Sequence, residues 1–185
     1  VHTDSPAVEK ARAGVIEFIL ANHPLDCPVC DAGGECDLQD AAFEYRCGWS
    51  RYDEPKVTYP DEWLCDHIIL NRNRCFRCYR CVRYYDEIVG TGELAPRYRG
   101  MWTQIATFNH EPLEYGLCGN LTEVCPLGAL TDGKYRFKAR PWEVRESPSI
   151  CPGCSLGCNV RVRTRFHKVV QVRPRDNDAV NEVWL

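Results

Sequence analysis

Four residues that can ligate a metal lie close together near the start of the chain. The spacing is His-x3-Cys-x2-Cys-x5-Cys, and the four residues are His23, Cys27, Cys30 and Cys36. The glycines at 33–34 supply the permissive backbone dihedrals that curl the chain back for the last cysteine. Three thiolates and one imidazole complete a four-coordinate site. That ligand count suits either a single zinc ion or a cubane 4Fe–4S cluster.

A second group of cysteines has the spacing Cys-x2-Cys-x2-Cys, which is the core of a bacterial-type ferredoxin. In a two-cluster ferredoxin the last cysteine of each run, followed by proline, ligates the cluster of the other run. Cys125 followed by Pro126 fits that position. The second expected cluster site is therefore formed by Cys75, Cys78, Cys81 and Cys125.

The partner cluster of that ferredoxin pattern has lost its ligands. It would need cysteines at positions 85, 115, 118 and 121, but only Cys118 is present, and the others are Tyr85, Tyr115 and Leu121. We expect the two tyrosines and the leucine to fill the vacated space by packing. Cys118 is then a structural remnant.

A third group, Cys151, Cys154 and Cys158, has the spacing Cys-x2-Cys-x3-Cys. It resembles the start of the cluster-binding region of molybdopterin oxidoreductases. The resemblance implies a fourth cysteine shortly after a string similar to residues 180–185, where this chain ends. We expect this third 4Fe–4S site to be incomplete in the chain as given.

The strings HPLDCPVCDAGGECDLQD and CGNLTEVCPLGALT resemble the large iron–sulfur subunits of bacterial NADH:quinone oxidoreductase, respiratory complex I. The resemblance implies 4Fe–4S clusters at the first two sites and a 2Fe–2S cluster before residue 1. It also implies electron transfer from a flavin subunit, which binds NADH, toward quinone-side iron–sulfur subunits. The expected location is the peripheral arm of that complex, on the cytoplasmic side of the bacterial inner membrane.

Two alternatives remain at this point. NAD-linked formate dehydrogenases and iron-only hydrogenases carry related relay arms, but they keep both ferredoxin clusters, so the degenerate second set favours complex I. A zinc-binding scaffold is disfavoured, because zinc ribbons pair one Cys-x2-Cys with another. The pattern shows no paired carboxylates, nucleophile–base pair or Gly-rich phosphate loop. The chain is therefore expected to lack a catalytic centre of its own and to act as part of an oxidoreductase complex.

Composition sets further bounds. The chain has 13 cysteines in 185 residues, mostly in tight clusters, which favours metal sites over a disulfide framework and indicates a reducing compartment. The net charge of −3 gives no support to nucleic-acid binding. The sequence contains no apolar run of membrane-spanning length, and we expect no signal peptide. The first residue is Val1, so we expect a segment of a longer protein.

The elements that present these ligands are short, and the expected fold is α+β, built from small loop-rich iron–sulfur modules over residues 1–64, 65–145 and 146–185. A helix is expected from Ser5 as N-cap and Pro6 to a stop at Pro24, so that His23 lies at its end. Its apolar positions at helical spacing are Val8, Ala11, Val15 and Ile19.

Further along, a short helix is expected over 82–89, ending at Gly90, and a strand within 101–108. A hairpin is expected from 159–163 and 168–173, with His167 exposed at its turn. Cys47 and Cys65 belong to no spaced pair and are expected to act as small buried apolar residues. Five arginines crowd the ferredoxin motif and are expected to supply counter-charge to a cluster or to face a partner subunit: Arg72, Arg74, Arg77, Arg80 and Arg83.

Overall fold

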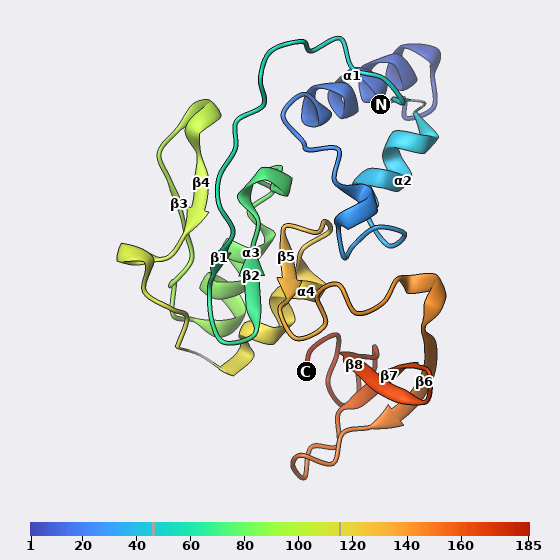
Figure 1. The fold of residues 1–185 in the computed structure, drawn as a ribbon, viewed down its shortest axis with the longest axis vertical. Coiled ribbons are helices and arrows are strands. Elements are labelled where there is room, and N and C mark those ends of the chain that lie inside the picture. The colour runs from blue at the N-terminus through green and yellow to red at the C-terminus, as the bar shows by residue number, and fades with distance from the viewer. Residues whose placement is uncertain (46, 115) are drawn as a thin grey trace.

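The structure is a computed structural model that describes residues 1–45, 47–114 and 116–185. Three groups of elements follow one another along the chain: an N-terminal pair of helices, a central group with two small sheets, and a C-terminal three-stranded sheet (Figure 1). This mixture of short helices and small sheets confirms the α+β fold. The module boundaries expected after residues 64 and 145 stay predictions.

The first helix, α1 (Pro6–Leu20), begins where the sequence indicated. The Ser5 hydroxyl accepts a hydrogen bond from the Val8 backbone N–H at 3.4 Å, and Pro6 occupies the first helical position. The predicted apolar face is only partly correct, because Val8 and Ile19 are half-buried whereas Ala11 and Val15 are exposed. The helix lies on the outside of its group, where it packs against α2 (Asp37–Glu44) and buries none of its residues fully.

The central group contains an antiparallel sheet in the order β1 (Glu62–Trp63), β2 (Ile68–Leu70), β5 (Leu130–Asp132). All three residues of β2 are buried, as expected for the middle strand of a sheet covered on both faces. A separate hairpin joins β3 (Ala95–Arg97) to β4 (Gln104–Ala106). The strand predicted within 101–108 is therefore present but short, because residues 100–102 form a 3₁₀ turn.

The helix predicted over 82–89 begins two residues earlier, as α3 (Arg80–Arg83), and continues as a π-helical turn over Tyr84–Val89. Its end is as predicted: Gly90 adopts a left-handed φ of 81°. A second short helix, α4 (Leu121–Val124), packs against α3 and leads into Cys125. Cys81, the last cysteine of the first run, therefore lies in α3, and Cys125 directly follows α4.

The space of the lost ferredoxin cluster is filled by side chains. Tyr85 and Leu121 are both 0% exposed and share one hydrophobic core with Cys118 and Cys65. The packing role predicted for the tyrosine and the leucine, and the burial predicted for Cys65, are confirmed. The same prediction is wrong for Cys47, which is only half-buried. A hydrogen bond from the Cys118 thiol lowers the pKa of Cys65. The third replacement, Tyr115, lies outside the described residues.

The fully buried Leu121 gives a direct test of this filled space. Leu121→Ala should cost about 2–5 kcal/mol of stability, because the truncated side chain leaves a cavity that the surrounding core cannot fully close. A lower urea midpoint with an unchanged slope would show the loss. Leu117→Ala is the matched control, since Leu117 is exposed and lies four residues earlier. Equal losses of stability in the two variants would contradict the role of Leu121 in filling this space.

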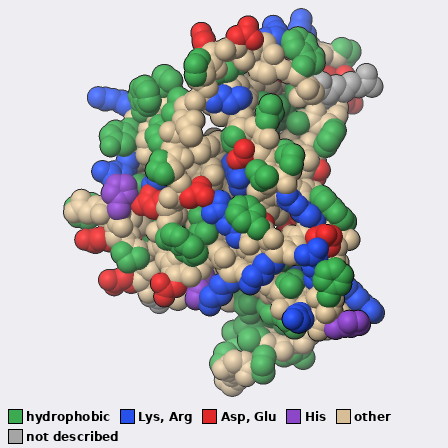
Figure 2. All heavy atoms as spheres, viewed as in Figure 1, with side chains coloured by type: hydrophobic (Ala, Val, Ile, Leu, Met, Phe, Trp, Pro, Cys, Tyr) green, Lys and Arg blue, Asp and Glu red, His purple; other side chains and the backbone are tan. Residues whose placement is uncertain are grey.

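The C-terminal sheet has the antiparallel order β6 (Arg145–Ile150), β7 (Asn159–Arg165), β8 (Lys168–Pro174). The predicted hairpin is confirmed, with Phe166 and His167 at its turn in left-handed conformations of φ 48° and 63°. His167 is exposed, also as predicted. Figure 2 shows Lys, Arg, Asp and Glu side chains interspersed with hydrophobic ones over the visible face. No helix in the described part of the chain is long and apolar enough to span a membrane.

Candidate iron–sulfur sites

The structure brings the four cysteines of the ferredoxin pattern together. Cys75, Cys78, Cys81 and Cys125 line one cavity, whose remaining wall includes apolar side chains of β2, β4 and β5. Three of these cysteines come from one loop and the start of α3, while Cys125 follows α4, 44 positions after Cys81. Four thiols around one largely apolar cavity is the arrangement that a cubane cluster requires.

Burial dominates the acid–base behaviour of these thiols. Burial raises the pKa of both Cys81 and Cys125, and the neighbouring cysteines add to the rise, so that the pKa is about 12 for Cys81 and about 11 for Cys125. The sulfur of Cys125 accepts hydrogen bonds from the backbone N–H groups of Leu127 and Leu130, and Cys75 Sγ accepts one from Arg77 at 3.4 Å. Bound iron would offset the mutual repulsion of the thiolates, and N–H donors to sulfur tune a cluster's potential. The residues present therefore fit such a group.

The loop that carries Cys75 and Cys78 is bent by residues in the left-handed region. Arg77 and Tyr79 have φ values of 62° and 61°, although neither is glycine. Such residues cost free energy and persist only where the surroundings hold them. Arg77 is held by donating to the carbonyls of Thr103, at 2.9 Å, and Met101, at 2.7 Å. No local sequence signal marked these bends.

The first ligand set lies in the turn between α1 and α2. Cys27 begins a 3₁₀ turn, Cys30 follows it, and Cys36 is the N-cap residue of α2. Burial raises the pKa of Cys36, and the nearby Cys30 and Cys27 raise it further, against backbone hydrogen bonds from Gln39 and Leu38 that lower it. The three cysteines are thus near neighbours, and their thiols share one electrostatic environment.

His23 is half-buried, three positions beyond the end of α1. Burial lowers its pKa, and the positive charges of Arg74 and Lys56 lower it further. Both effects favour the neutral imidazole, which is the form that binds a metal. Among the described residues no hydrogen bond joins the His23 ring to the three cysteines, so its role as the fourth ligand stays a prediction.

The two glycines between Cys30 and Cys36 act in different ways. Gly34 has a φ of 97°, which confirms the expected need for a permissive dihedral. The same expectation is wrong for Gly33, which is not among the glycines with positive φ. Gly33 is needed for space instead, because a Cβ there would come within 2.6 Å of the Cys27 carbonyl and 3.0 Å of the Cys30 carbonyl.

Residues far away in the sequence clamp this first loop. Arg140 donates to the carbonyl oxygens of Pro28 and Cys30. Arg74, only 4% exposed, forms an ion pair with Asp26 at 2.9 Å. Sequence reasoning missed these contacts because their partners are 48 to 112 positions apart. No local pattern could have identified them.

The arginines around the ferredoxin motif mostly bind protein groups. Arg72 pairs with Glu62, Arg74 with Asp26, and Arg77 with the two carbonyls described above. The charges of Arg77 and Arg72 also oppose the rise in the pKa of Cys75 that burial causes. Counter-charge is thus supported for two of the five, whereas Arg80 and Arg83 are exposed.

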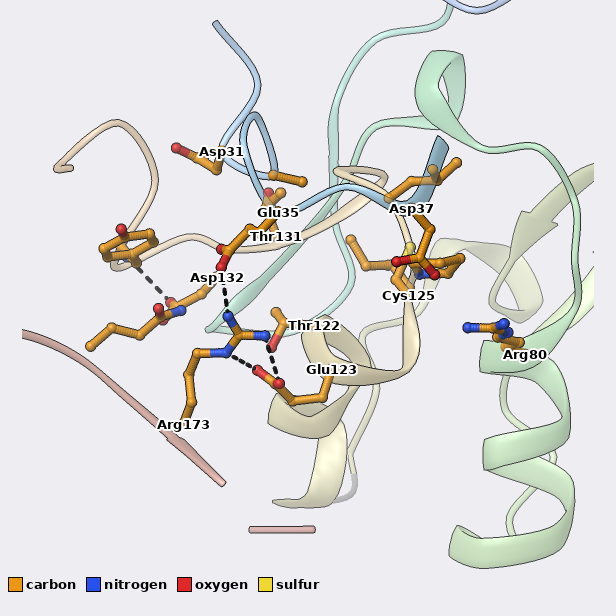
Figure 3. Close-up of a pocket in the computed structure, with 16 residues that line it drawn as sticks. Asp31, Glu35, Asp37, Arg80, Thr122, Glu123, Cys125, Thr131, Asp132 and Arg173 are labelled. Atoms are coloured by element: carbon orange, nitrogen blue, oxygen red, sulfur yellow. Dashed lines mark hydrogen bonds and ion pairs between the residues drawn. The ribbon is translucent and has the colours of Figure 1, made fainter. Parts of the chain in front are cut away.

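A pocket of about 190 Å³ lies where the three groups of elements meet (Figure 3). At its edge the Arg173 guanidinium lies between Glu35, which it contacts at 3.0 Å, and Glu123, at 2.7 Å. The nearly buried Arg163 also binds Glu35 at 2.6 Å. Burial opposes ionisation of Glu35, but the two arginines outweigh it and hold its pKa below the ordinary value. Glu35 therefore joins the first ligand loop to the C-terminal sheet.

The third group of cysteines lies in the loop between β6 and β7. The backbone N–H of Cys151 donates to the carbonyl of Cys158 at 2.8 Å, which closes the loop at its base. Cys154 at the tip is exposed, and Gly157 turns the chain with a φ of 64°. Cys151 and Cys158 are half-buried, and the assignment of the three cysteines to a cluster stays a prediction.

Every cysteine lies in the described part of the chain, and none of the thirteen forms a disulfide. In that same part no three His, Cys, Asp or Glu side chains converge closely enough to hold a single metal ion. A cubane differs from such a site, because each of its ligands binds a different iron atom.

Three protein-family models match the chain. Residues 12–51 match the NADH-ubiquinone oxidoreductase-G iron-sulfur binding region. Residues 65–131 match the ferredoxin-like domain of NADH-quinone oxidoreductase subunit 3, and residues 144–185 match the molybdopterin oxidoreductase Fe4S4 domain. Each match covers one of the three cysteine groups described above, and the set from Cys75 to Cys125 falls wholly within the second. The matches identify iron–sulfur-binding regions of the 4Fe–4S type.

Similar proteins and structures agree with these regions. A crystal structure of an NAD+-reducing NiFe hydrogenase in the H2-reduced state has a similar fold, with a TM-score of 0.63 and 22% identity over 74% of this chain and 59% of that one. The G subunit of NADH-quinone oxidoreductase from Rickettsia bellii is 44% identical over the whole chain, which covers 27% of that protein. The mitochondrial 78 kDa subunit of NADH-ubiquinone oxidoreductase from Neurospora crassa is 47% identical, with 25% of it covered. The chain thus spans about a quarter of the length of these relatives, and over its whole length it is similar to that segment of the G subunits of NADH-quinone oxidoreductase.

Proposed function

We propose that this chain is an electron-relay segment of an NADH:quinone oxidoreductase. The observation that carries the proposal is the cavity lined by Cys75, Cys78, Cys81 and Cys125, beside a second group of three cysteines in the neighbouring loop. Bound clusters supply one-electron chemistry. The chain's own residues hold the iron, exclude water through apolar packing, and donate backbone N–H groups to sulfur.

The proposed cluster content follows the ligand sets. One 4Fe–4S cluster is held by Cys75, Cys78, Cys81 and Cys125, and another by His23, Cys27, Cys30 and Cys36. The site of Cys151, Cys154 and Cys158 lacks its fourth ligand within this chain. The 2Fe–2S cluster expected before residue 1 lies outside the chain and stays a prediction.

The proposed partners are a flavin subunit that oxidises NADH and the iron–sulfur subunits that lead to quinone. The relatives that support this are subunits of an oxidoreductase complex, and they include bacterial and mitochondrial proteins. We place this chain in the peripheral arm, on the cytoplasmic side of a bacterial inner membrane. Catalysis of NADH oxidation then belongs to the partner, because the proposed sites here only accept and pass on electrons.

A second candidate is the relay arm of an NAD-linked hydrogenase or formate dehydrogenase. The observation that favours it is the fold shared with the NAD+-reducing hydrogenase. The filled space around Tyr85 and Leu121 favours the first candidate, because the expectation for these enzymes is that both ferredoxin clusters are kept. The purified full-length complex should transfer electrons from NADH to quinone, and neither hydrogen nor formate should reduce it. Reduction by hydrogen or formate would favour the second candidate instead.

Metal analysis of the anaerobically reconstituted chain tests the proposal directly. We expect about eight iron and eight acid-labile sulfide per chain, four of each for every complete cubane. An excess above eight would come from the third, incomplete group. Stoichiometric zinc without sulfide would contradict the proposal and support a zinc scaffold instead.

A further inference from the structure

Three contacts join the loop of the first ligand set to the segments that carry the second, and each involves a predicted ligand or its immediate neighbour. The closest is between Cys30 and Gly128, which lies three positions after Cys125. A Cβ placed on Gly128 would overlap the sulfur of Cys30, so only glycine leaves room for that sulfur. It would also come within 3.3 Å of the Ala32 side chain.

The second contact is a backbone hydrogen bond. The N–H of Asp37, next to Cys36, donates to the carbonyl oxygen of Pro126, next to Cys125, at 3.2 Å. Figure 3 shows Asp37 and Cys125 side by side at the edge of the pocket. A path from one ligand to the other therefore crosses two residues and one hydrogen bond.

The third contact runs through Arg74, the neighbour of Cys75. Its guanidinium binds Asp26, the neighbour of Cys27, at 2.9 Å and the carbonyl oxygen of Gly128 at 3.5 Å. Because Arg74 is only 4% exposed, water competes little for these bonds. Each of the three contacts thus involves a different cysteine of the first loop or the residue next to it.

Resting on the function proposed above, we propose that residues 126–128 and Asp37 form the bridge through which the two clusters exchange electrons, with Gly128 as the positioning residue that sets their separation. The step that the bridge serves is a one-electron exchange: one cluster is oxidised as the other is reduced, and no bond is made or broken and no proton moves. Electron tunnelling is favoured by short, packed paths, and this one contains a sulfur in contact with backbone. Leu127 and Ala129, 3% and 2% exposed, hold that backbone in place.

Gly128→Ala in the reconstituted chain is the first test. The added methyl group must push the Cys30 sulfur away, because the buried backbone around Gly128 has no free space to move into. We expect both clusters to remain by iron and sulfide content, the magnetic coupling between them in EPR of the fully reduced protein to weaken, and their electron exchange after flash reduction to slow severalfold. Gly119→Ala is the matched control, since a Cβ there meets nothing within 4 Å.

Asp37→Pro supplies an independent test, which decides the matter if Gly128→Ala loses a cluster. Proline has no N–H, so the bond to Pro126 is lost. The residue is the first of α2, where proline is tolerated, and Cys36 before it is already extended, with φ −124° and ψ 117°. Asp37→Ala removes the same carboxylate but keeps the N–H. We expect slower exchange in Asp37→Pro and wild-type exchange in Asp37→Ala.

The outcomes separate this bridge from the proposed function. Wild-type protein that binds no cluster would overturn both. Two results would overturn the bridge alone, provided that the wild-type protein binds two clusters. The first is unchanged coupling and electron exchange in a Gly128→Ala variant that keeps both clusters. The second, which applies if Gly128→Ala loses a cluster, is equal electron exchange in Asp37→Pro and Asp37→Ala. Redox titration gives the reduction potential of each cluster in every variant. Exchange rates are then compared at an equal potential difference between the two clusters, so that a change in driving force is not mistaken for a change in the bridge.

Discussion

Cys125→Ser should abolish the ferredoxin-type cluster and leave the cluster of the first loop in place. Cys125 is the one member of its set that comes from the second half of the pattern, and without its thiolate the cavity offers three sulfurs instead of four. The loss of one coordination bond from a buried cubane removes a large part of the free energy that holds it. Iron and sulfide should fall by about four each, and the EPR signal of that cluster should disappear.

Cys118→Ser is the matched control for this result. Cys118 is also buried, at 5% exposure, and lies only seven positions from Cys125, but it faces Cys65 and the filled space around Tyr85 and Leu121. We expect unchanged iron content and unchanged EPR signals, with only a small loss of stability. If Cys118→Ser removed a cluster, the pairing of ligands in the ferredoxin pattern would be wrong.

His23→Ala should destabilise the cluster of the first loop and spare the one in the ferredoxin cavity. The imidazole supplies the fourth ligand of that set in the proposed arrangement, and alanine offers none. Iron content should fall by about four, and only the first cluster's EPR signal should be lost. An unchanged spectrum would remove His23 from the ligand set.

His23→Cys distinguishes a ligand from a merely structural histidine. If the shorter side chain reaches the iron from this position, three residues beyond α1, the cluster should be retained. Because a neutral imidazole is then replaced by a thiolate, the cluster becomes one charge more negative, and its reduction potential should shift downward. A redox titration followed by EPR measures the shift. A retained cluster with an unchanged potential would argue against direct ligation by His23.

The sequence by itself determined the three groups of cysteines, because the spacing of ligands on one short loop is a local property of the chain. It also determined the start of α1 at Ser5 and Pro6 and the hairpin that turns at Phe166 and His167. Each of these rests on residues a few positions apart, and their backbone geometry follows from local rules on capping, turns and ligand reach. The distant Cys125 was assigned only because a known pattern connects it to the first three cysteines.

Tertiary structure alone decided what lies against these local units. The exposure of Ala11 and Val15 on α1 depends on how little of that helix α2 covers, which periodicity does not report. The space requirement at Gly33 likewise depends on carbonyls folded back from three and six positions away.

The same holds for the contacts that join the modules. Arg140 reaches Pro28 across 112 positions, and Glu35 reaches Arg163 across 128. The approach of the Cys30 sulfur to Gly128 depends on the packing of two loops from different modules. Such pairings follow from the global arrangement of the chain, in which many residues together decide which surfaces meet, so no short pattern encodes them.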